Sequence, residues 1–295
     1  MLSLKRGDPI AQCTKGKSEA TVRIFGKDTF VNQEPDLKID ANERIELVPK
    51  SFLKEHKANK EQVRAAMEAG TELGQEADEL VQESLRTNIS LPDFQCFPIA
   101  QNRSERLFIS GPSGSGKSTM IGEYCRRLQA KEKKRKIYIF SRVLEDAPLD
   151  ALKHVTRVPL EEKFWSWVTL RPEDFESSVL VFDDIDTILD KNLLKRVRAF
   201  RDDCLECGRH YGLTVICACH LLTDFSRTRT IINEAMAVCV FPRDSGQAAI
   251  QRFLESYLGL GREMIRELCA LPTRWLWFNK TYPRFVVWQS GARLL

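Results

Sequence analysis

The sequence lacks any long uninterrupted apolar run. No stretch approaches the roughly 20 apolar residues that a membrane-spanning helix needs, and the first residues, MLSLKRGDPIAQ, do not contain the apolar segment of a secretory signal. Internal repeats and low-complexity tracts are also missing, while hydrophobic residues make up 43% of the 295 residues, enough to bury a core. We therefore expect a folded protein with no membrane span that stays in the cytoplasm.

The chain also lacks a strong excess of one charge and an even number of cysteines. Residues 1–90 carry 14 Lys and Arg against 16 Asp and Glu, and the rest of the chain carries 31 against 25. A mildly basic C-terminal part is compatible with a nucleic-acid partner but does not require one. Because several of the nine cysteines lie in apolar runs, such as Cys217 and Cys219, we expect buried reduced thiols, not a disulfide framework.

The residue pattern divides the chain into two parts. Residues 51–86 combine apolar residues at helical spacing with many Glu and Lys, which predicts helices that Gly70 and Gly74 weaken or split. We treat residues 1–91 as a small mixed, partly helical N-terminal extension. It either packs on the main body or serves as a partner or oligomerisation arm, and residues 92–295 form the predicted core domain.

From residue 92 onward, short apolar runs alternate with helical stretches. This pattern predicts an α/β protein with a mostly parallel central sheet flanked by helices. The last two runs flank a short polar segment and predict a C-terminal β-hairpin. The predicted strands are Leu107–Ser110, Ile137–Phe140, Val179–Phe182, Leu213–Cys217, Ala237–Phe241, Trp275–Phe278 and Phe285–Trp288.

A glycine-rich motif is the strongest chemical signal. The segment GPSGSGKS that begins at Gly111 matches G-x-x-x-x-G-K-[ST], follows an apolar run and opens a helical stretch. Its backbone N–H groups would surround phosphate oxygens at the N-terminus of that helix. Lys117 would reach the β- and γ-phosphates, and Ser118 would ligate Mg²⁺. The sequence therefore predicts a P-loop NTPase that binds ATP and Mg²⁺ through Gly111, Pro112, Ser113, Gly114, Ser115, Gly116, Lys117, Ser118 and Thr119.

A second motif supplies carboxylates at the end of a strand. The buried-strand pattern Val179–Phe182 is followed directly by Asp183 and Asp184. Asp183 would hold Mg²⁺, and Asp184 would act as the general base toward the attacking water. Asp186 follows on the loop, where we expect a helix cap or a solvated charge.

The two motifs do not by themselves identify the class of enzyme. The LSGGQ-type signature of transporter ATPases is absent from the sequence, and Asn279-Lys-Thr-Tyr lacks the Asp of a guanine-specific [NT]-K-x-D motif. We can assign no Arg-rich lid of the kind that nucleotide kinases use. A P-loop nucleotide kinase and an ATP-gated assembly or scaffold protein remain the alternatives to an ATPase motor.

Residues 193–207 predict a helix that carries several basic side chains. A solvated basic face is the simpler interpretation of these residues, and a contact with nucleic-acid phosphates is the alternative. Cys204, Cys207 and His210 have a zinc-like spacing, but the two cysteines lie in the helical stretch, so we favour packing roles. The basic residues are Lys191, Lys195, Arg196, Arg198 and Arg201.

The order of the motifs resembles a known family. GPSGSGKST and VLVFDDID are followed by CGRHYGLTVICACH, RTIINEA and TRWLWFNKTYPRFVV. This order resembles the viral DNA-packaging ATPases of the FtsK–HerA superfamily, most of all the poxvirus and giant-virus branch. The likeness covers residues 92–291, and its most specific part is the Gly-Arg-His-Tyr-Gly turn that leads into a strand ending in His.

The resemblance implies a RecA-like core assembled as a homo-oligomeric ring. Such a ring would use ATP hydrolysis to package double-stranded DNA into a capsid, would contact the DNA phosphate backbone without sequence preference, and would meet a capsid or portal component. It would work at the cytoplasmic site of viral assembly or in the virion.

The resemblance also implies roles for single residues. Arg209 would be the finger that reaches a neighbour's γ-phosphate, with Arg229 as second choice, and His220 would be a polar sensor. The wider superfamily usually has Glu where this chain has Asp184, whose side chain is one methylene shorter. The reach of Asp184 toward the water is therefore the point at which this chain departs from the family pattern.

Overall fold

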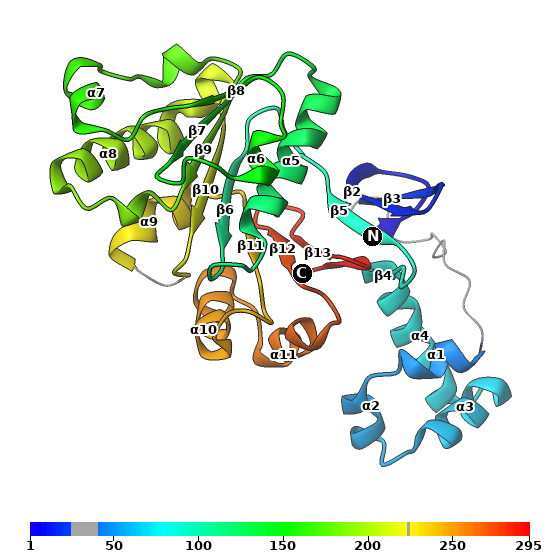
Figure 1. Cartoon of the computed structure of the whole chain (residues 1–295). Coiled ribbons are helices and arrows are strands. Elements are labelled where there is room, and N and C mark those ends of the chain that lie inside the picture. The colour runs from blue at the N-terminus through cyan, green and yellow to red at the C-terminus, as the bar shows by residue number, and fades with distance from the viewer. Residues whose placement is uncertain (25–40, 223–224) are drawn as a thin grey trace. The chain divides into compact units, whose positions relative to one another are not determined.

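The computed structural model describes residues 1–24, 41–222 and 225–295. These residues form two compact units, one of residues 1–96 with 290–294 and one of residues 97–289 with Leu295 (Figure 1). The sequence predicts a boundary after residue 91, whereas the division falls between Cys96 and Phe97. The difference arises because β5 (Gln95–Pro98) begins in the sheet of the first unit.

An antiparallel sheet opens the first unit. β2 (Asp8–Lys15) and β3 (Ser18–Ile24) form a hairpin, β1 (Leu2–Ser3) pairs with β3, and β5 lies beside β2. A disulfide joins Cys13 on β2 to Cys96 on β5. The expectation of reduced thiols is therefore wrong for this pair, because a separation of 83 residues in sequence does not reveal that adjacent strands bring the two Cα atoms to 3.8 Å.

The helices of the first unit build an apolar cluster of their own. They are α1 (Ala41–Glu46), α2 (Lys50–Glu55), α3 (Lys60–Ala69) and α4 (Glu72–Thr87). The predicted break is confirmed, because Gly70 ends α3 with a left-handed φ of 66°. α4 then passes so close to α3 that a Cβ on Gly74 would lie 2.1 Å from the Ala66 carbonyl oxygen. The cluster consists of Ile45, Val48, Phe52, Val63, Ala77, Val81 and Leu85.

Two short strands complete the first unit. β4 (Asn88–Ser90), which follows α4 directly, pairs antiparallel with β14 (Gly291–Leu294) from the C-terminal end of the chain. Neither strand is predicted from the sequence, since β4 has only three residues and β14, with the sequence GARL, contains no apolar run.

The second unit contains the large sheet. Its strand order is β13-β12-β11-β6-β10-β9-β7-β8, parallel from β11 to β8 and antiparallel among β11, β12 and β13. The predicted α/β class, the mostly parallel sheet and the C-terminal hairpin are confirmed. The strands are β6 (Arg106–Ser110), β7 (Ile137–Ser141), β8 (Val155–Arg157), β9 (Val179–Asp183), β10 (Thr214–Cys219), β11 (Ala237–Val240), β12 (Leu276–Asn279) and β13 (Phe285–Trp288).

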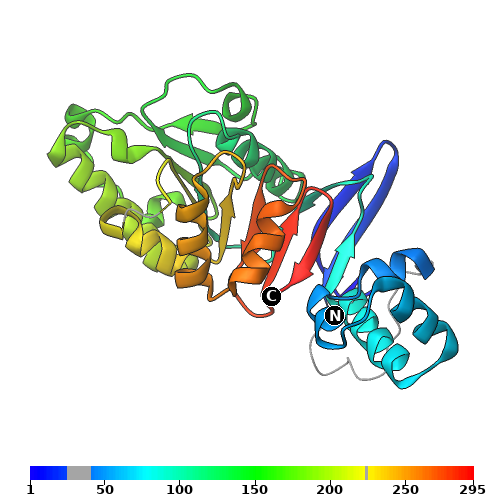
Figure 2. The ribbon, with the colours of Figure 1, turned by 90° about the horizontal axis from the view of Figure 1, so that it is seen from below.

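Helices cover both faces of this sheet. Figure 1 shows α5 (Lys117–Lys131) and α6 (Ala147–Asp150) on one side, and α8 (Lys191–Cys207) and α9 (Phe225–Glu234) on the other. Figure 2 shows α10 (Gln247–Leu258) and α11 (Arg262–Ala270) beside the antiparallel strands. None of the helices in the described part of the chain is long and apolar enough to cross a membrane.

The main apolar core lies between the sheet and α8. Phe140 of β7 and Phe182 of β9 stack with ring centroids 4.6 Å apart, and Phe200 of α8 lies 5.6 Å from Phe140. Trp165 of α7 (Glu162–Trp167) belongs to the same cluster. Trp275, Trp277 and Trp288 are likewise buried, as expected for core packing and not for base stacking.

Candidate active site

The predicted nucleotide-binding residues meet at the carboxyl edge of the parallel strands. The register aligns Ser110 of β6 with Cys219 of β10, and it aligns Asp183 of β9 with Ala218 of β10 and with Ser141 of β7. The loops that leave these strand ends therefore lie next to one another. In open parallel α/β sheets, ligands bind at this edge.

The glycine-rich segment forms the predicted strand–loop–helix unit. Residues 111–116 join β6 to α5, which begins at Lys117. The Gly111 N–H donates to the Cys219 carbonyl at 3.2 Å and fixes the start of the loop. A Cβ on Gly111 would lie 2.6 Å from Ser115 Oγ and 2.7 Å from Cδ2 of Phe241, so this position admits only glycine without rearrangement. The P-loop fold is thereby confirmed by the chain's own topology.

Lys117 is held inside the site by four neighbours. Its side chain is 7% exposed, and Nζ donates to the carbonyl oxygens of Gly111 at 2.9 Å and Pro112 at 3.4 Å. Nζ also lies 3.1 Å from His220 Nδ1 and 3.8 Å from Asp184 Oδ2. Because an ammonium group can only donate, His220 Nδ1 accepts this bond. His220 Nε2 then carries the proton that faces Asp184 Oδ2 at 2.9 Å.

The two aspartates have different surroundings. Asp183 is 5% exposed and accepts a hydrogen bond from Ser141 Oγ at 3.1 Å. Burial, together with the neighbouring Asp184 carboxylate, raises the pKa of Asp183. Burial also raises the pKa of Asp184, against the opposing effects of Lys117 and His220. Ionising the buried Asp183 and the half-buried Asp184 together costs free energy, and a cation between them and a phosphate group would lower that cost.

The donor set around Asp183 suits Mg²⁺. Mg²⁺ takes oxygen ligands, and proteins usually hold it through one or two carboxylates while water and substrate phosphates complete its shell. Asp183 provides such a carboxylate at the end of β9, and Ser118 carries a hydroxyl in the first turn of α5. In the described ranges, 1–24, 41–222 and 225–295, no group of three or more His, Cys, Asp or Glu could hold a metal, at this site or at any other.

Asp184 has a strained backbone that aims its side chain. It occupies the left-handed region at φ 46° and ψ 35°, and its N–H donates to the Ala218 carbonyl at 3.1 Å. Aspartate tolerates this region better than most residues, and such conformations are concentrated at functional sites. Despite its shorter side chain, Asp184 reaches both His220 and Lys117.

Asp186 does not have the surroundings that we expected. It pairs with Arg198 of α8 at 2.6 Å, and the N-cap of α8 is Asp190. The expectation of a helix cap or a solvated charge is therefore wrong. The ion pair forms because η3 (Ile185–Thr187) turns the chain back toward α8 directly after the strand.

A small cavity opens beside the catalytic candidates. Its volume is about 130 Å³, and its lining includes Asp184, Cys219, His220 and Thr228. Liquid water occupies about 30 Å³ per molecule, so several waters could stand next to the Asp184 carboxylate. The arrangement can therefore hold and orient a nucleophilic water.

The structure separates the two candidate finger arginines. Arg209 is exposed in η4 (Gly208–Tyr211), before β10 and so at the amino edge of the sheet. The six residues of β10, at about 3.3 Å each, put it roughly 20 Å from the phosphate loop of its own chain. Arg229 lies on α9 next to Thr228, a residue of the cavity lining. The role of each arginine toward a neighbouring subunit stays a prediction.

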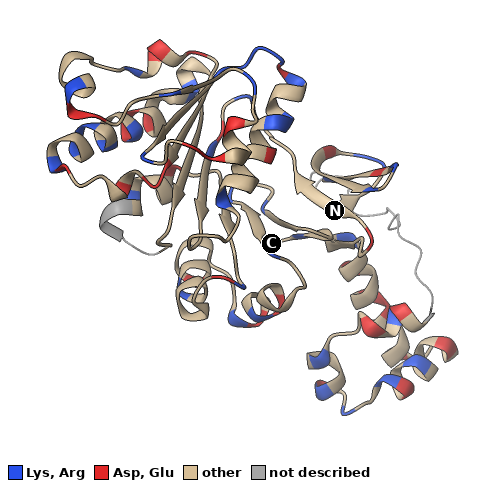
Figure 3. Ribbon diagram, in the orientation of Figure 1, with Lys and Arg blue, Asp and Glu red and all other residues tan. Residues whose placement is uncertain are grey.

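The arginines of α8 form ion pairs within the chain. Arg196 lies 3.3 Å from Glu162, Arg198 pairs with Asp186, and the 3%-exposed Arg201 lies 2.7 Å from Asp202. Figure 3 shows that the ribbon of α8 carries both basic and acidic residues. A solvated basic face is therefore wrong for Arg198 and Arg201, whereas Lys191, Lys195 and Arg196 are exposed as that interpretation expects. The ion pairs of the arginines do not favour α8 as a phosphate contact.

Sequence reasoning missed three residues at the site. Ser141 could have been found, because it directly follows a predicted strand that runs parallel to the Asp183 strand. Arg274 donates from Nη2 to the Ser115 carbonyl at 3.3 Å, and Phe241 packs against Gly111. No local pattern shows that the loop before β12 and the end of β11 reach the phosphate loop.

Comparison with known proteins gives one related sequence and several partial likenesses. No protein-family model matches the chain. It is 36% identical over 193 residues to the uncharacterized protein V3 of Sputnik virophage, a match that covers 65% of this chain and 77% of V3.

Among solved structures, the chain is similar to the genome packaging NTPase B204 of Sulfolobus turreted icosahedral virus 2, with a TM-score of 0.44 and 16% identity over 64% of this chain and 98% of B204. It is also similar to the pCW3 conjugation coupling protein TcpA, with a TM-score of 0.47 and 12% identity over 96% of this chain and 76% of TcpA.

Proposed function

The chain belongs to the family of the Sputnik virophage protein V3, and we propose that it is a magnesium-dependent ATPase that translocates double-stranded DNA during viral genome packaging. One observation carries this proposal. Lys117 of the phosphate loop, His220 and Asp184 lie within hydrogen-bond or ion-pair distance at the edge of the parallel sheet where nucleotides bind.

The contacts of Lys117 indicate how ATP binding would prepare the site. ATP phosphates would replace the Gly111 and Pro112 carbonyls as partners of Nζ and draw Lys117 away from His220 and Asp184. Asp184 could then accept a proton from the water beside it, while the water oxygen attacks the γ-phosphorus and the bond to the β–γ bridging oxygen breaks. His220 would keep its hydrogen bond to Asp184 and would act as the sensor, changing its contacts according to whether the γ-phosphate is present.

Asp183 and the Ser118 hydroxyl would hold Mg²⁺, with Ser141 fixing the orientation of the Asp183 carboxylate. The ion supplies positive charge between the β- and γ-phosphates when it is bound. The positive charge of Lys117 adds to that of the ion, so the buried carboxylates can remain ionised.

A homo-oligomeric ring would complete the site. The Arg209 side chain is roughly 20 Å from its own phosphate loop by the strand-length estimate above, so it would act on the neighbour's γ-phosphate. An arginine supplied in this way stabilises the charge of the transition state and ties hydrolysis to assembly. The viral source of V3 and the resemblance of the motif order to viral DNA-packaging ATPases support DNA as the moved substrate.

ATP turnover with and without long double-stranded DNA tests this function, with Lys117→Ala as the blank. DNA should stimulate turnover, and the stimulation should fade as salt is added, because phosphate contacts release counterions. Turnover that is indifferent to DNA would contradict the translocase. Phosphorylation of a nucleotide acceptor would instead indicate a kinase, and very slow turnover without either effect would indicate an ATP-gated scaffold.

A further inference from the structure

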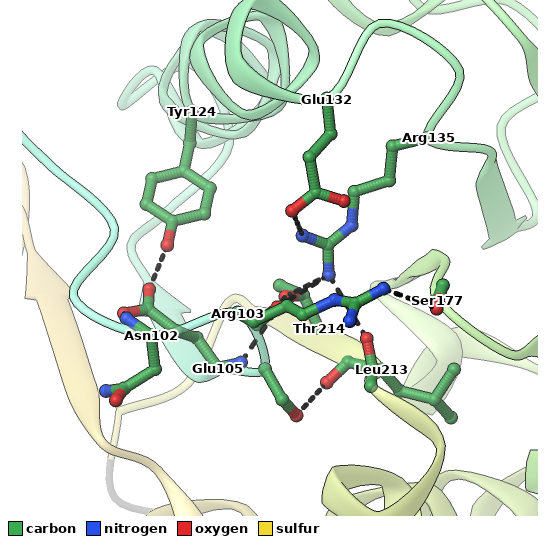
Figure 4. A network of polar contacts seen from close by, with 11 residues as sticks. Asn102, Arg103, Glu105, Tyr124, Glu132, Arg135, Ser177, Leu213 and Thr214 are labelled. Atoms are coloured by element: carbon green, nitrogen blue, oxygen red, sulfur yellow. Dashed lines mark hydrogen bonds and ion pairs between the residues drawn. The ribbon is translucent and has the colours of Figure 1, made fainter.

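A buried arginine lies at the amino edge of the large sheet, opposite the phosphate loop. Arg135 stands between α5 and β7, and its side chain is 1% exposed. Its Nη2 donates to the Arg103 carbonyl at 2.8 Å, to Thr214 Oγ1 at 2.9 Å and to the Gly212 carbonyl at 3.2 Å (Figure 4). A single guanidinium group therefore joins its own segment to two others that are distant in sequence, at Arg103 and at Gly212–Thr214.

A buried carboxylate extends this network to the phosphate-loop helix. Glu105 is 5% exposed and accepts hydrogen bonds from the Tyr124 hydroxyl on α5 and from the N–H groups of Gln101 at 2.6 Å and Asn102 at 3.0 Å. The Glu105 N–H donates to Thr214 Oγ1 at 3.3 Å. The Thr214 hydroxyl is thus shared between the Arg135 and Glu105 parts of the network.

The network ends on the turn that carries Arg209. The Gly212 N–H donates to the Arg209 carbonyl at 3.2 Å, and the Leu213 N–H donates to the Gly208 carbonyl at 3.0 Å. The carbonyls of the same two residues, Gly212 and Leu213, accept from Arg135 Nη2 and Ser104 Oγ. The turn is therefore closed by its own backbone and held from outside by buried polar groups.

The other end of the network reaches the nucleotide site through one rigid element. Tyr124 and Lys117 both lie on α5, seven residues apart, which corresponds to about 10 Å along a helix axis. A shift of α5 when the phosphate loop closes would move the Tyr124 hydroxyl, and with it Glu105 and Thr214. A network that only filled the core would not need to connect these two functional segments.

We propose that Arg135, Glu105, Tyr124 and Thr214 position the Arg209 turn relative to the phosphate-loop helix of the same subunit. The nucleotide state of one subunit then sets how well its Arg209 serves the neighbour's site. These four are positioning residues, since none of them contacts the nucleotide. The inference rests on the proposed function, because it requires Arg209 to act between subunits.

Mixing of subunits tests the positioning role. Asp184→Asn subunits bind ATP but cannot hydrolyse it, so they have a dead site and an Arg209 turn in the ATP-bound state, whereas Arg209→Ala subunits have an intact site but no finger. Mixed rings should regain turnover where an intact finger meets an intact site. If the network positions the finger, Thr214→Val and Arg135→Lys should behave like Arg209→Ala in these mixtures. Misplacement of a catalytic group by about 1 Å can lower the rate about 100-fold, so we expect kcat to fall by about that factor with the KM for ATP unchanged.

Thr214→Val keeps the volume of the buried side chain, so it remains informative if Arg135→Lys does not fold. Thr87→Val removes a hydroxyl from a half-buried threonine of α4, in the first unit and outside the network, and should keep the wild-type kcat.

The outcomes separate the two proposals. Rescue of Thr214→Val and Arg135→Lys by Asp184→Asn subunits supports the positioning role. Unchanged kcat, or a loss that Asp184→Asn subunits do not rescue although they rescue Arg209→Ala, would overturn it and leave the proposed function standing. Failure to rescue Arg209→Ala would overturn the action of Arg209 between subunits and this inference together, while DNA-stimulated turnover of the wild type would still decide the translocase.

Discussion

The close approach of Gly111 to Ser115 and Phe241 leads to a specific prediction for ATP binding. Gly111→Ala introduces a Cβ that would lie 2.6 Å from Ser115 Oγ and 2.7 Å from Cδ2 of Phe241. The serine hydroxyl can rotate away, but the Phe241 ring is 2% exposed and has little room to move. Relief of the contact therefore requires a shift of the loop, whose N–H groups must surround the phosphates.

The expected magnitude follows from the cost of overpacking. Extra methyl groups in packed regions cost about 1–3 kcal/mol, and each 1.4 kcal/mol corresponds to about a tenfold change in an equilibrium constant. If most of that energy falls on the loop conformation that binds nucleotide, the Kd for ATP should rise roughly 5- to 150-fold. Gly246→Ala is the matched control, because no atom lies within 4 Å of its added Cβ.

Titration with a fluorescent ATP analogue measures both variants against the wild type, and a thermal melt of each shows whether the fold is retained. Gly111→Ala should bind weakly while folded, and Gly246→Ala should bind like the wild type. Wild-type affinity of a folded Gly111→Ala would refute the argument that this close approach shapes the phosphate loop.

Two further predictions test the role of Asp184 as general base and the burial of Cys125. Asp184→Asn should keep ATP affinity within a few-fold and lower turnover by about 10²–10⁴-fold, the usual contribution of a general base; equal turnover in a single-turnover assay would remove Asp184 from the mechanism. Among the free cysteines, Cys207 is exposed, whereas burial raises the pKa of Cys125 to about 12. Because a thiol reagent reaches exposed side chains first, at pH 8 it should modify Cys207 before Cys125 and leave Cys125 intact until unfolding. Modification of Cys125 in folded Cys207→Ser would contradict this burial.

The parts of the fold that depend on local pattern could be predicted from the sequence. The segments of β6, β7, β9, β10 and β11 are short apolar runs bounded by helical stretches. Their hydrophobic pattern and length are therefore sufficient to predict strands. The carboxyl ends of parallel strands share one edge, which is why Lys117, Asp183, Asp184 and His220 could be expected together. The pairing of His220 with both Lys117 and Asp184 could not be predicted from the sequence, because it depends on the side-chain rotamers that the structure shows.

The features that could not be predicted from the sequence depend on contacts between segments that are distant in the chain. Cys13 and Cys96 meet because β5 joins a sheet made by the first residues of the chain, and an odd cysteine count gives no sign of this. β8 has only three residues, so Val155–Arg157 presents no recognisable alternation. Arg135 and Glu105 look like ordinary surface charges in the sequence, and only the fold reveals that both are buried partners of a common network.

Displacement of a triplex-forming oligonucleotide from linear double-stranded DNA tests the central claim most directly. The wild-type protein with ATP and Mg²⁺ should strip the third strand, whereas Lys117→Ala and Asp184→Asn should leave it bound. Wild-type protein that hydrolyses ATP without removing the oligonucleotide, or that removes it equally well without ATP, would contradict a motor driven by this site.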